Sequence, residues 1–197
     1  QAAPVASSRA QTAQETMPDG LMSAFLAASS QPFEASAEGH RARSGGLDFT
    51  LRLSGLQANG EGFAWGLALS GLGRGGQIAS LPEAESAQGD NRLEYRRGAL
   101  TEWYRDTALG VEQGFTIQQA PRGAAPLVLQ LDLLTGLAGA VDADGRGLSF
   151  AGLDGQVLRY DHLRAWDAGG VELDATLLYA SGRVMIEVRD QGAAYPL

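Results

Sequence analysis

The chain has 197 residues, enough to bury a hydrophobic core as one domain or as two small β-sandwiches. Its formal net charge of −8 and its 15 basic residues, all of them arginine, argue against a nucleic-acid-binding protein. The absence of cysteine excludes disulfides, a thiol nucleophile and cysteine-ligated metal sites. No apolar run approaches the roughly 18 residues of a membrane-spanning helix, so we expect no transmembrane segment.

Residues 1–32 are expected to form an extended arm followed by one short helix. Residues 1–18 are rich in Ala, Ser, Gln and Thr and contain no aromatic side chain, so they have little apolar surface to offset the entropy of ordering. The helix is predicted from Asp19 to Ser30, with Asp19 as its N-cap. The chain begins at Gln1 without methionine and continues AAPVASS, which resembles a mature chain after removal of a signal peptide. Such a start is compatible with secretion.

From residue 33 to residue 197, an alternation of apolar and polar side chains predicts an all-β domain. The clearest examples are the runs LDFTLRLS and LVLQLDL, in which every second residue is apolar. The predicted strands cover residues 47–54, 63–69, 92–96, 111–118, 127–133, 147–151, 156–160, 171–178 and 183–189. We expect a hairpin turn at Asn59 and Gly60 and a surface loop over residues 71–89. Short strands separated by glycine turns favour an antiparallel β-sandwich, either as one domain or as two packed sub-sandwiches.

The most distinctive segment runs from Asn91 to Thr116 and reads NRLEYRRGALTEWYRDTALGVEQGFT. It resembles the EWYxNxxxGLEQGFT-like motif in the N-terminal modules of large secreted bacterial proteins that carry FG-GAP, integrin-like β-propeller repeats. The resemblance continues through a D-x-x-G-R turn at 142–146, the run 160–170 and the closing DQGAAYPL at 190–197.

The resemblance covers about residues 40–197, and two features depart from the family pattern. Asp106 stands where the family commonly has Asn, and the 197 residues contain none of the propeller repeats that usually follow the module. Any role of those repeats therefore does not transfer to this chain. The motif positions that we single out as structural are Glu102, Trp103, Tyr104, Glu112, Gln113, Gly114, Phe115, Tyr195 and Pro196.

The resemblance implies a secreted or cell-surface protein. Our leading hypothesis is a non-enzymatic structural or assembly module whose partners are other copies of itself or a further extracellular domain. In a sharper form of this hypothesis, the N-terminal arm adds a strand to an exposed sheet edge of a neighbouring copy, and repetition of the contact builds a filament. The alternative is a carbohydrate-binding or adhesive module that uses Trp65, Trp103 or Trp166 as a platform for a glycan.

A third hypothesis treats Glu102 and Glu112 as a catalytic pair. Two carboxylates about 5–10 Å apart can serve as acid and nucleophile or base in glycoside hydrolysis. We favour the structural interpretation, in which nearby arginines such as Arg105 form partly buried ion pairs with these glutamates. Trp103 and Phe115 are then expected to be core or inter-sheet anchors.

No metal or cofactor is expected. His40 and His162 lack the spacing of a zinc site. The sequence Asp142-Ala-Asp144-Gly resembles the beginning of a calcium loop without its remaining ligands, and a hairpin turn explains it better; a weak calcium site made by two such loops is the alternative. The glycine-rich run 71–76 precedes no helix with a lysine, so we expect a flexible loop and no phosphate site.

Overall fold

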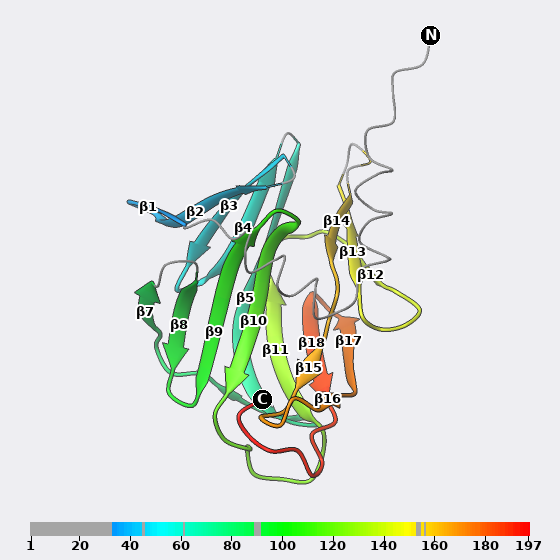
Figure 1. The fold of residues 1–197 in the computed structure, drawn as a ribbon. Helices are drawn as coiled ribbons and strands as arrows, with labels where there is room; N and C mark the ends of the chain where they lie inside the picture. Colours follow the sequence, from blue (N-terminus) through cyan, green and yellow to red (C-terminus); the bar gives the residue numbers. More distant parts are fainter. Residues whose placement is uncertain (1–32, 45, 61, 89–91, 153–154, 156) are drawn as a thin grey trace.

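The computed structural model describes residues 33–44, 46–60, 62–88, 92–152, 155 and 157–197 (Figure 1). Over these residues the chain forms 18 strands and no helix, and all the sheets are antiparallel. The predicted all-β, antiparallel sandwich is therefore confirmed. The predicted arm and the helix from Asp19 to Ser30 lie outside the described residues. No helix in the described part of the chain has the length and apolar character needed to cross a membrane.

The largest sheet forms one layer of the sandwich. Its strands follow the order β1-β2-β3-β4-β5-β11-β18-β17, and β6 pairs with β5 beside this path. They are β1 (Glu34–Ser36), β2 (Gly39–Ser44), β3 (Leu47–Arg52), β4 (Gly55–Gly60), β5 (Phe63–Arg74), β6 (Gln77–Ser80), β11 (Leu127–Leu133), β17 (Ala175–Ala180) and β18 (Arg183–Val188). Five consecutive hairpin connections build the first half of this sheet, so local pairing explains most of its topology.

Three smaller sheets complete the fold. A four-stranded sheet has the order β10-β9-β8-β7, a three-stranded sheet has the order β12-β13-β14, and β15 pairs with β16. Their strands are β7 (Glu85–Gln88), β8 (Leu93–Arg97), β9 (Leu100–Thr107), β10 (Gly110–Ile117), β12 (Gly139–Val141), β13 (Leu148–Ala151), β14 (Val157–Tyr160), β15 (Ala165–Trp166) and β16 (Glu172–Leu173). Figure 1 shows the β7–β10 sheet in front of the large sheet, with β12–β14 beside it.

One hydrophobic cluster fills the space between the sheets. It joins Leu67 of the large sheet, Leu93 of the four-stranded sheet and Leu148 of the three-stranded sheet, all fully buried. Aromatic rings also link two of these sheets, because the ring centroids of Trp65 on β5 and Phe150 on β13 lie 5.6 Å apart. The three larger sheets therefore depend on a common core.

The predicted loop over residues 71–89 is wrong. Strand β5 continues to Arg74, and β6 and β7 occupy much of the remainder. The glycines that suggested a loop serve close packing instead: a Cβ added to Gly73 would lie 2.0 Å from the carbonyl oxygen of Gln77 on the paired strand. Glycine in this strand permits close approach of neighbouring backbone and does not mark flexibility.

The predicted hairpin turn at Asn59 and Gly60 is also misplaced. Both residues belong to β4 and pair with Ala64 and Phe63 of β5, so the turn follows them and includes Gly62, whose φ is +69°. The predicted strand over 171–178 is divided between β16 and β17, whereas the strands over 127–133 and 183–189 agree closely with β11 and β18. Strands that the alternation did not reveal are β1, β2, β4, β6, β7, β9, β12 and β15.

Candidate functional site

The distinctive EWY and EQGF segments form the hairpin β9–β10. Glu102 pairs with Phe115, Trp103 with Gly114 and Tyr104 with Gln113. Because side chains alternate between the two faces of a strand, the motif divides into an inner set and an outer set. The inner set is Glu102, Tyr104, Gln113 and Phe115, and the outer set is Trp103, Glu112 and Gly114.

The inner side chains build a buried polar network that we call the inner cluster, consisting of Glu102, Tyr104, Gln113 and Tyr160. Glu102 is 1% exposed, and its Oε1 accepts hydrogen bonds from the Tyr104 hydroxyl at 2.5 Å and from Gln113 Nε2 at 2.7 Å. The Tyr160 hydroxyl donates to Gln113 Oε1 at 3.1 Å. Since Tyr160 lies on β14, the inner cluster ties the three-stranded sheet to the β9–β10 hairpin.

Burial dominates the electrostatics of this cluster. It raises the pKa of Glu102, while the hydrogen bonds from Tyr104 and Gln113 act in the opposite direction. Burial, followed by the negative charge of Glu102, raises the pKa of Tyr95 to about 12 and also raises the pKa of Tyr160. The hydroxyls of Tyr104 and Tyr160 therefore remain protonated, and they donate to Glu102 and Gln113 respectively.

The outer side chains form a second arrangement, the outer stack, which consists of Arg92, Trp103 and Arg105 over Gly114. A Cβ added to Gly114 would lie 2.0 Å from Cζ2 of Trp103, so the indole rests directly on the glycine backbone. The guanidinium carbons of Arg92 and Arg105 lie 4.5 and 5.2 Å from the ring centroid. The arginines and the glycine backbone thus cover the indole by cation–π and packing contacts.

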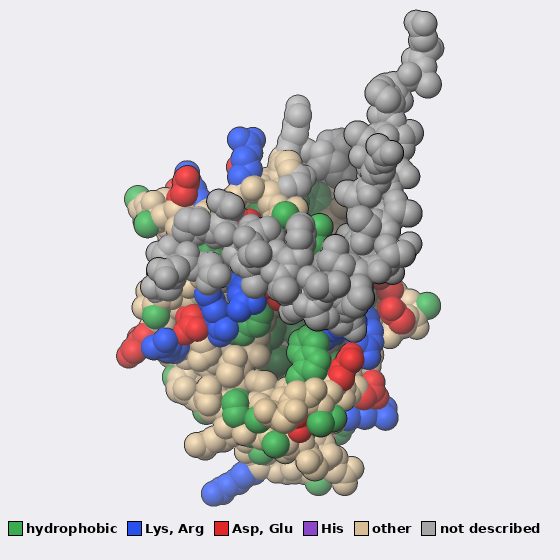
Figure 2. Space-filling view, viewed as in Figure 1, with side chains coloured by type: hydrophobic (Ala, Val, Ile, Leu, Met, Phe, Trp, Pro, Cys, Tyr) green, Lys and Arg blue, Asp and Glu red, His purple; other side chains and the backbone are tan. Residues whose placement is uncertain are grey.

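Acidic side chains neutralise the outer stack. Arg92 Nε lies 3.0 Å from an oxygen of Glu94, and Arg105 lies 3.8 Å from an oxygen of Glu112. Glu94 also receives two hydrogen bonds from Arg96. Figure 2, viewed as in Figure 1, shows basic and acidic side chains next to each other on this side of the molecule. The arginines of the outer stack are therefore paired with acidic side chains of the same sheet.

The positions of Glu102 and Glu112 contradict the hydrolase hypothesis for this pair. Glu102 points into the core and Glu112 lies on the opposite face of the sheet, so the two carboxylates do not share a cleft. The expected ion pair is present between Glu112 and Arg105, but the hydrogen-bond donors to Glu102 are Tyr104 and Gln113. Trp103 lies on the outer face and not in the core as expected, whereas Phe115 packs against the core.

The three tryptophans do not form one aromatic platform. Trp65 is 3% exposed and belongs to the core, Trp103 is covered in the outer stack, and Trp166 on β15 is 47% exposed. They lie on three different sheets. Of the three, Trp166 is the indole that offers the most surface to a ligand.

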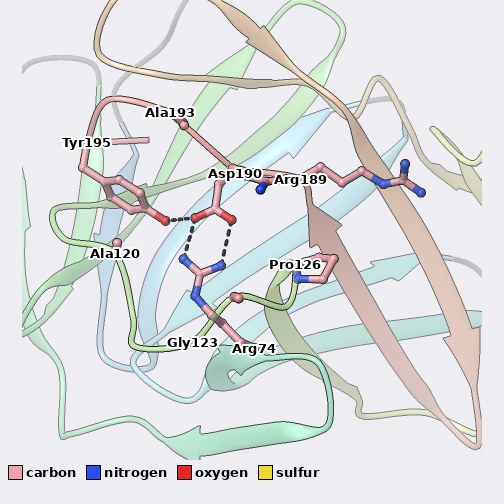
Figure 3. A pocket seen from close by; sticks show the side chains of 11 residues that line it. Arg74, Ala120, Gly123, Pro126, Arg189, Asp190, Ala193 and Tyr195 are labelled. Atoms are coloured by element: carbon pink, nitrogen blue, oxygen red, sulfur yellow. Dashed lines mark hydrogen bonds and ion pairs between the residues drawn. The ribbon is translucent and has the colours of Figure 1, made fainter.

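Two residues of the closing motif, Asp190 and Tyr195, form a C-terminal clasp with Arg74 of β5 (Figure 3). Arg74 donates to both carboxylate oxygens of Asp190, at 2.8 and 2.6 Å, and to the carbonyl oxygens of Pro121 and Ala125. The Tyr195 hydroxyl donates to the same carboxylate. These hydrogen bonds hold the pKa of Asp190 below its usual range and raise that of Arg74.

The clasp borders a recess of about 450 Å³ that is otherwise lined mainly by small residues, including Ala120, Gly123 and Ala193. The guanidinium group of Arg74 and the carboxylate of Asp190 form an ion pair, and their side chains are only 10% and 5% exposed. Pro196 follows Tyr195 through a cis peptide bond, and Leu197 then exchanges two backbone hydrogen bonds with Ile117. The recess therefore lies beside structural contacts that hold the C-terminal residues against β5 and β10.

The acidic turns also have structural partners. Asp142 accepts a hydrogen bond from Arg159 at 2.6 Å, and Asp144 accepts one from the backbone N–H of Arg146. Asp167 accepts from the backbone N–H groups of its own turn and of Ala194. Within the described residues, no three His, Asp or Glu side chains lie close enough to hold a metal ion, so the calcium alternative has no ligand set there.

The two histidines are far apart in the topology. His40 lies on β2 at one end of the large sheet, and His162 follows β14. His162 Nδ1 lies 2.6 Å from Asp161 Oδ1, which lowers the pKa of Asp161 to about 2 and raises the pKa of His162. This contact is an exposed local pair between adjacent residues.

Sequence reasoning missed Arg74 and Tyr160 as members of these arrangements. Arg74 ends a glycine-rich run and its partner Asp190 lies 116 residues later, so no local spacing connects them. Tyr160 stood in a motif run, but the alternation of β14 did not reveal that its hydroxyl reaches Gln113. The sequence offers one indication that Arg74 has a structural role: it is a large charged residue at the end of a run of mostly small residues.

Comparison with known proteins gives no relative for this chain. No protein-family model matches it, and neither a curated protein nor a solved structure matches it.

Proposed function

We propose that this chain is a secreted, non-enzymatic structural module that takes part in an extracellular or cell-surface assembly. The observation that supports this proposal best is that the residues of the distinctive motif make packing and hydrogen-bond contacts within the fold. Its inner residues are hydrogen-bonded inside the sandwich, and its outer residues pack Trp103 against Gly114 and two arginines. The inner residues join the β9–β10 hairpin to β14, and the outer residues pack within the four-stranded sheet, so the motif residues make structural contacts, as a structural or assembly module requires. The resemblance of the same residues to secreted bacterial modules supports the extracellular location.

In this proposal the module associates with further copies of itself through its N-terminal arm. Residues 1–18 carry only Arg9 and Glu15 as charged side chains and are otherwise small or polar. Such a segment suits main-chain pairing with a sheet edge, because backbone hydrogen bonds there need little side-chain specificity. A head-to-tail contact of this kind that does not close into a ring produces a filament.

The test is the particle size of the 197-residue chain over a range of concentrations, measured by light scattering and negative-stain microscopy. We expect large oligomers or filaments, and we expect them to disappear when residues 1–18 are deleted. A variant in which every second residue of 1–18 is replaced by proline keeps the chain length but removes backbone N–H donors, so it should behave like the deletion. A 20.6 kDa monomer at every concentration, or association that survives the deletion, would refute self-association through the arm.

A carbohydrate-binding or adhesive function is the second candidate, and the exposure of Trp166 favours it. Trp166 and Val171, which flank the turn between β15 and β16, are 47% and 60% exposed. Exposed indoles provide stacking surfaces for sugars because one ring face is apolar and flat. Screening the chain and its Trp166→Ala variant against a glycan array tests this candidate. Binding that Trp166→Ala abolishes would support it, and the absence of binding by the unaltered chain would eliminate it.

A further inference from the structure

Within the described residues, strand β10 is an open edge of the four-stranded sheet. β9 pairs with it on one side along its whole length, and on the other side no described strand pairs with it. β14 approaches it through a side-chain contact, from Tyr160 to Gln113, and the two strands share no backbone ladder. With eight residues, β10 is the longest strand at a sheet edge in the described part of the chain.

The direction of each backbone group on β10 follows from two hydrogen-bond patterns. Ile117 exchanges both of its backbone bonds with Leu197, on the side away from β9, whereas the N–H of Gln118 bonds to Ala99 on the β9 side. In an antiparallel ladder these directions alternate with every residue. The N–H and C=O groups of Val111, Gln113 and Phe115 therefore point outward like those of Ile117.

In the described part of the chain, β10 lacks several of the usual protections of an edge strand, although it carries the charged side chain of Glu112. Its sequence GVEQGFTI contains no proline or lysine, and its register with β9 is unbroken from Gly110 to Ile117. Proteins normally block such edges with prolines, lysines, bulges or a covering segment. Strand β17, at an edge of the large sheet, is partly covered, because the N–H of Leu177 donates to the carbonyl of Gly145. Among the described residues, the backbone pairing on the outer side of β10 is that of Ile117 with Leu197.

We propose that the open edge of β10 is the acceptor for the N-terminal arm, residues 1–18, of a second copy of this chain. The arm forms backbone hydrogen bonds with Val111, Gln113 and Phe115 and continues the edge at which Leu197 already pairs. This inference rests on the proposed assembly function and names the surface that carries it.

The sequence of the arm fits this edge. Residues 5–17 contain no proline, so they offer an unbroken run of backbone donors longer than the three outward positions require. Their side chains are mostly small, and the inward-facing neighbours on the acceptor strand are already the larger Gln113 and Phe115. A strand with small inward side chains adds to the layer without displacing the inner cluster.

Hydrogen exchange resolved to single amides tests the proposal on the unaltered chain. At low concentration we expect the amides of Val111, Gln113 and Phe115 to exchange quickly, whereas those of Glu112 and Gly114, bonded to β9, exchange slowly. In the assembled state the three outward amides should slow by about tenfold or more, and the inward amides serve as internal controls. In a chain without residues 1–18, the outward amides should stay fast at every concentration.

The outcomes separate this inference from the proposed function. Assemblies in which the three outward amides remain fast overturn the β10 site and leave self-association standing. Failure of the chain to associate at all refutes the assembly function and this inference with it.

Proline substitution provides an independent measurement. Val111→Pro removes one outward N–H without removing a hydrogen bond to β9, so we expect association to weaken about tenfold while the monomer stays folded. Ser86→Pro is the matched control, because Ser86 lies on β7 at the opposite edge of the same sheet and its N–H also points outward. Equal association of the two variants would overturn the proposal, provided circular dichroism shows both to be folded. If Val111→Pro does not fold, the exchange experiment decides.

Discussion

Replacing Gly114 by alanine should destabilise the protein through a single contact. The added Cβ would lie 2.0, 2.3 and 2.5 Å from three atoms of the Trp103 indole. Carbon atoms in contact normally lie about 3.5–4.0 Å apart, so the ring has to move by about 1.5 Å. That movement also disturbs the positions of Arg92 and Arg105 over the ring.

The expected magnitude combines two opposing effects. Overpacking of this kind costs about 1–3 kcal/mol, whereas alanine in place of glycine in a strand gains about 0.5–1 kcal/mol. We therefore expect Gly114→Ala to lower the free energy of unfolding by about 1–2 kcal/mol. In a Trp103→Ala background the indole is gone, and the same substitution should instead stabilise the protein by about 0.5 kcal/mol.

Urea unfolding of the four proteins in this cycle measures both values. Gly76→Ala serves as a control, because a Cβ at Gly76 meets no atom within 4 Å. The reasoning would be refuted if Gly114→Ala had the same effect with and without the tryptophan. A change of sign between the two backgrounds would establish that the indole is the reason for glycine at this position.

Further predictions concern the buried carboxylates of Asp190 and Glu102. Arg74→Met should lower the free energy of unfolding by about 3–5 kcal/mol, because it leaves Asp190 buried without its cation, and adding Asp190→Leu should restore much of that loss in urea unfolding. Folding lowers the pKa of Asp190, so its contribution to the free energy of unfolding is present above the pKa of the unfolded state and should be lost as the pH falls below about 4. An Asp190→Asn variant whose stability falls with decreasing pH just as that of the unaltered chain does would contradict this. The pKa of Glu102 is raised on folding, so its carboxylate should reduce stability as the pH rises above about 4.5, and Glu102→Gln should flatten that part of the profile. Identical pH profiles of Glu102→Gln and the unaltered chain between pH 4 and 8 would show that Glu102 is not the group responsible.

The fold class was predictable because alternation of apolar residues is a local property of the sequence. β11 and β18 are continuous alternating runs, and both were found with nearly correct bounds. Strands rich in glycine or polar residues were not predicted, because they lack this alternation. The SGLGR end of β5 has no alternation that separates it from a loop, and its place in the sheet is decided by close contact with β6 and β11.

The candidate site was predictable in its residues but not in its arrangement. The motif singled out Glu102, Trp103 and Glu112, and alternation alone places Glu102 and Trp103 on opposite faces once β9 is known to be a strand. The strand itself was missed, because LTEWYRDT places polar and charged residues in both sets. Partners such as Tyr160 come from a different sheet, and contacts between sheets leave no fixed spacing in the sequence.

The pairing of Trp103 with Gly114 has a consequence for how the hairpin finds its alignment. A slip of β10 by one residue would turn Gln113 and Phe115 outward and bring Glu112 toward the core. A slip by two residues would preserve the faces but place Glu112 or Thr116 beneath the indole, where a side chain has no space. A tryptophan that accepts only a glycine opposite it therefore disfavours hairpins that are misaligned by two residues, which the alternation of faces alone would tolerate.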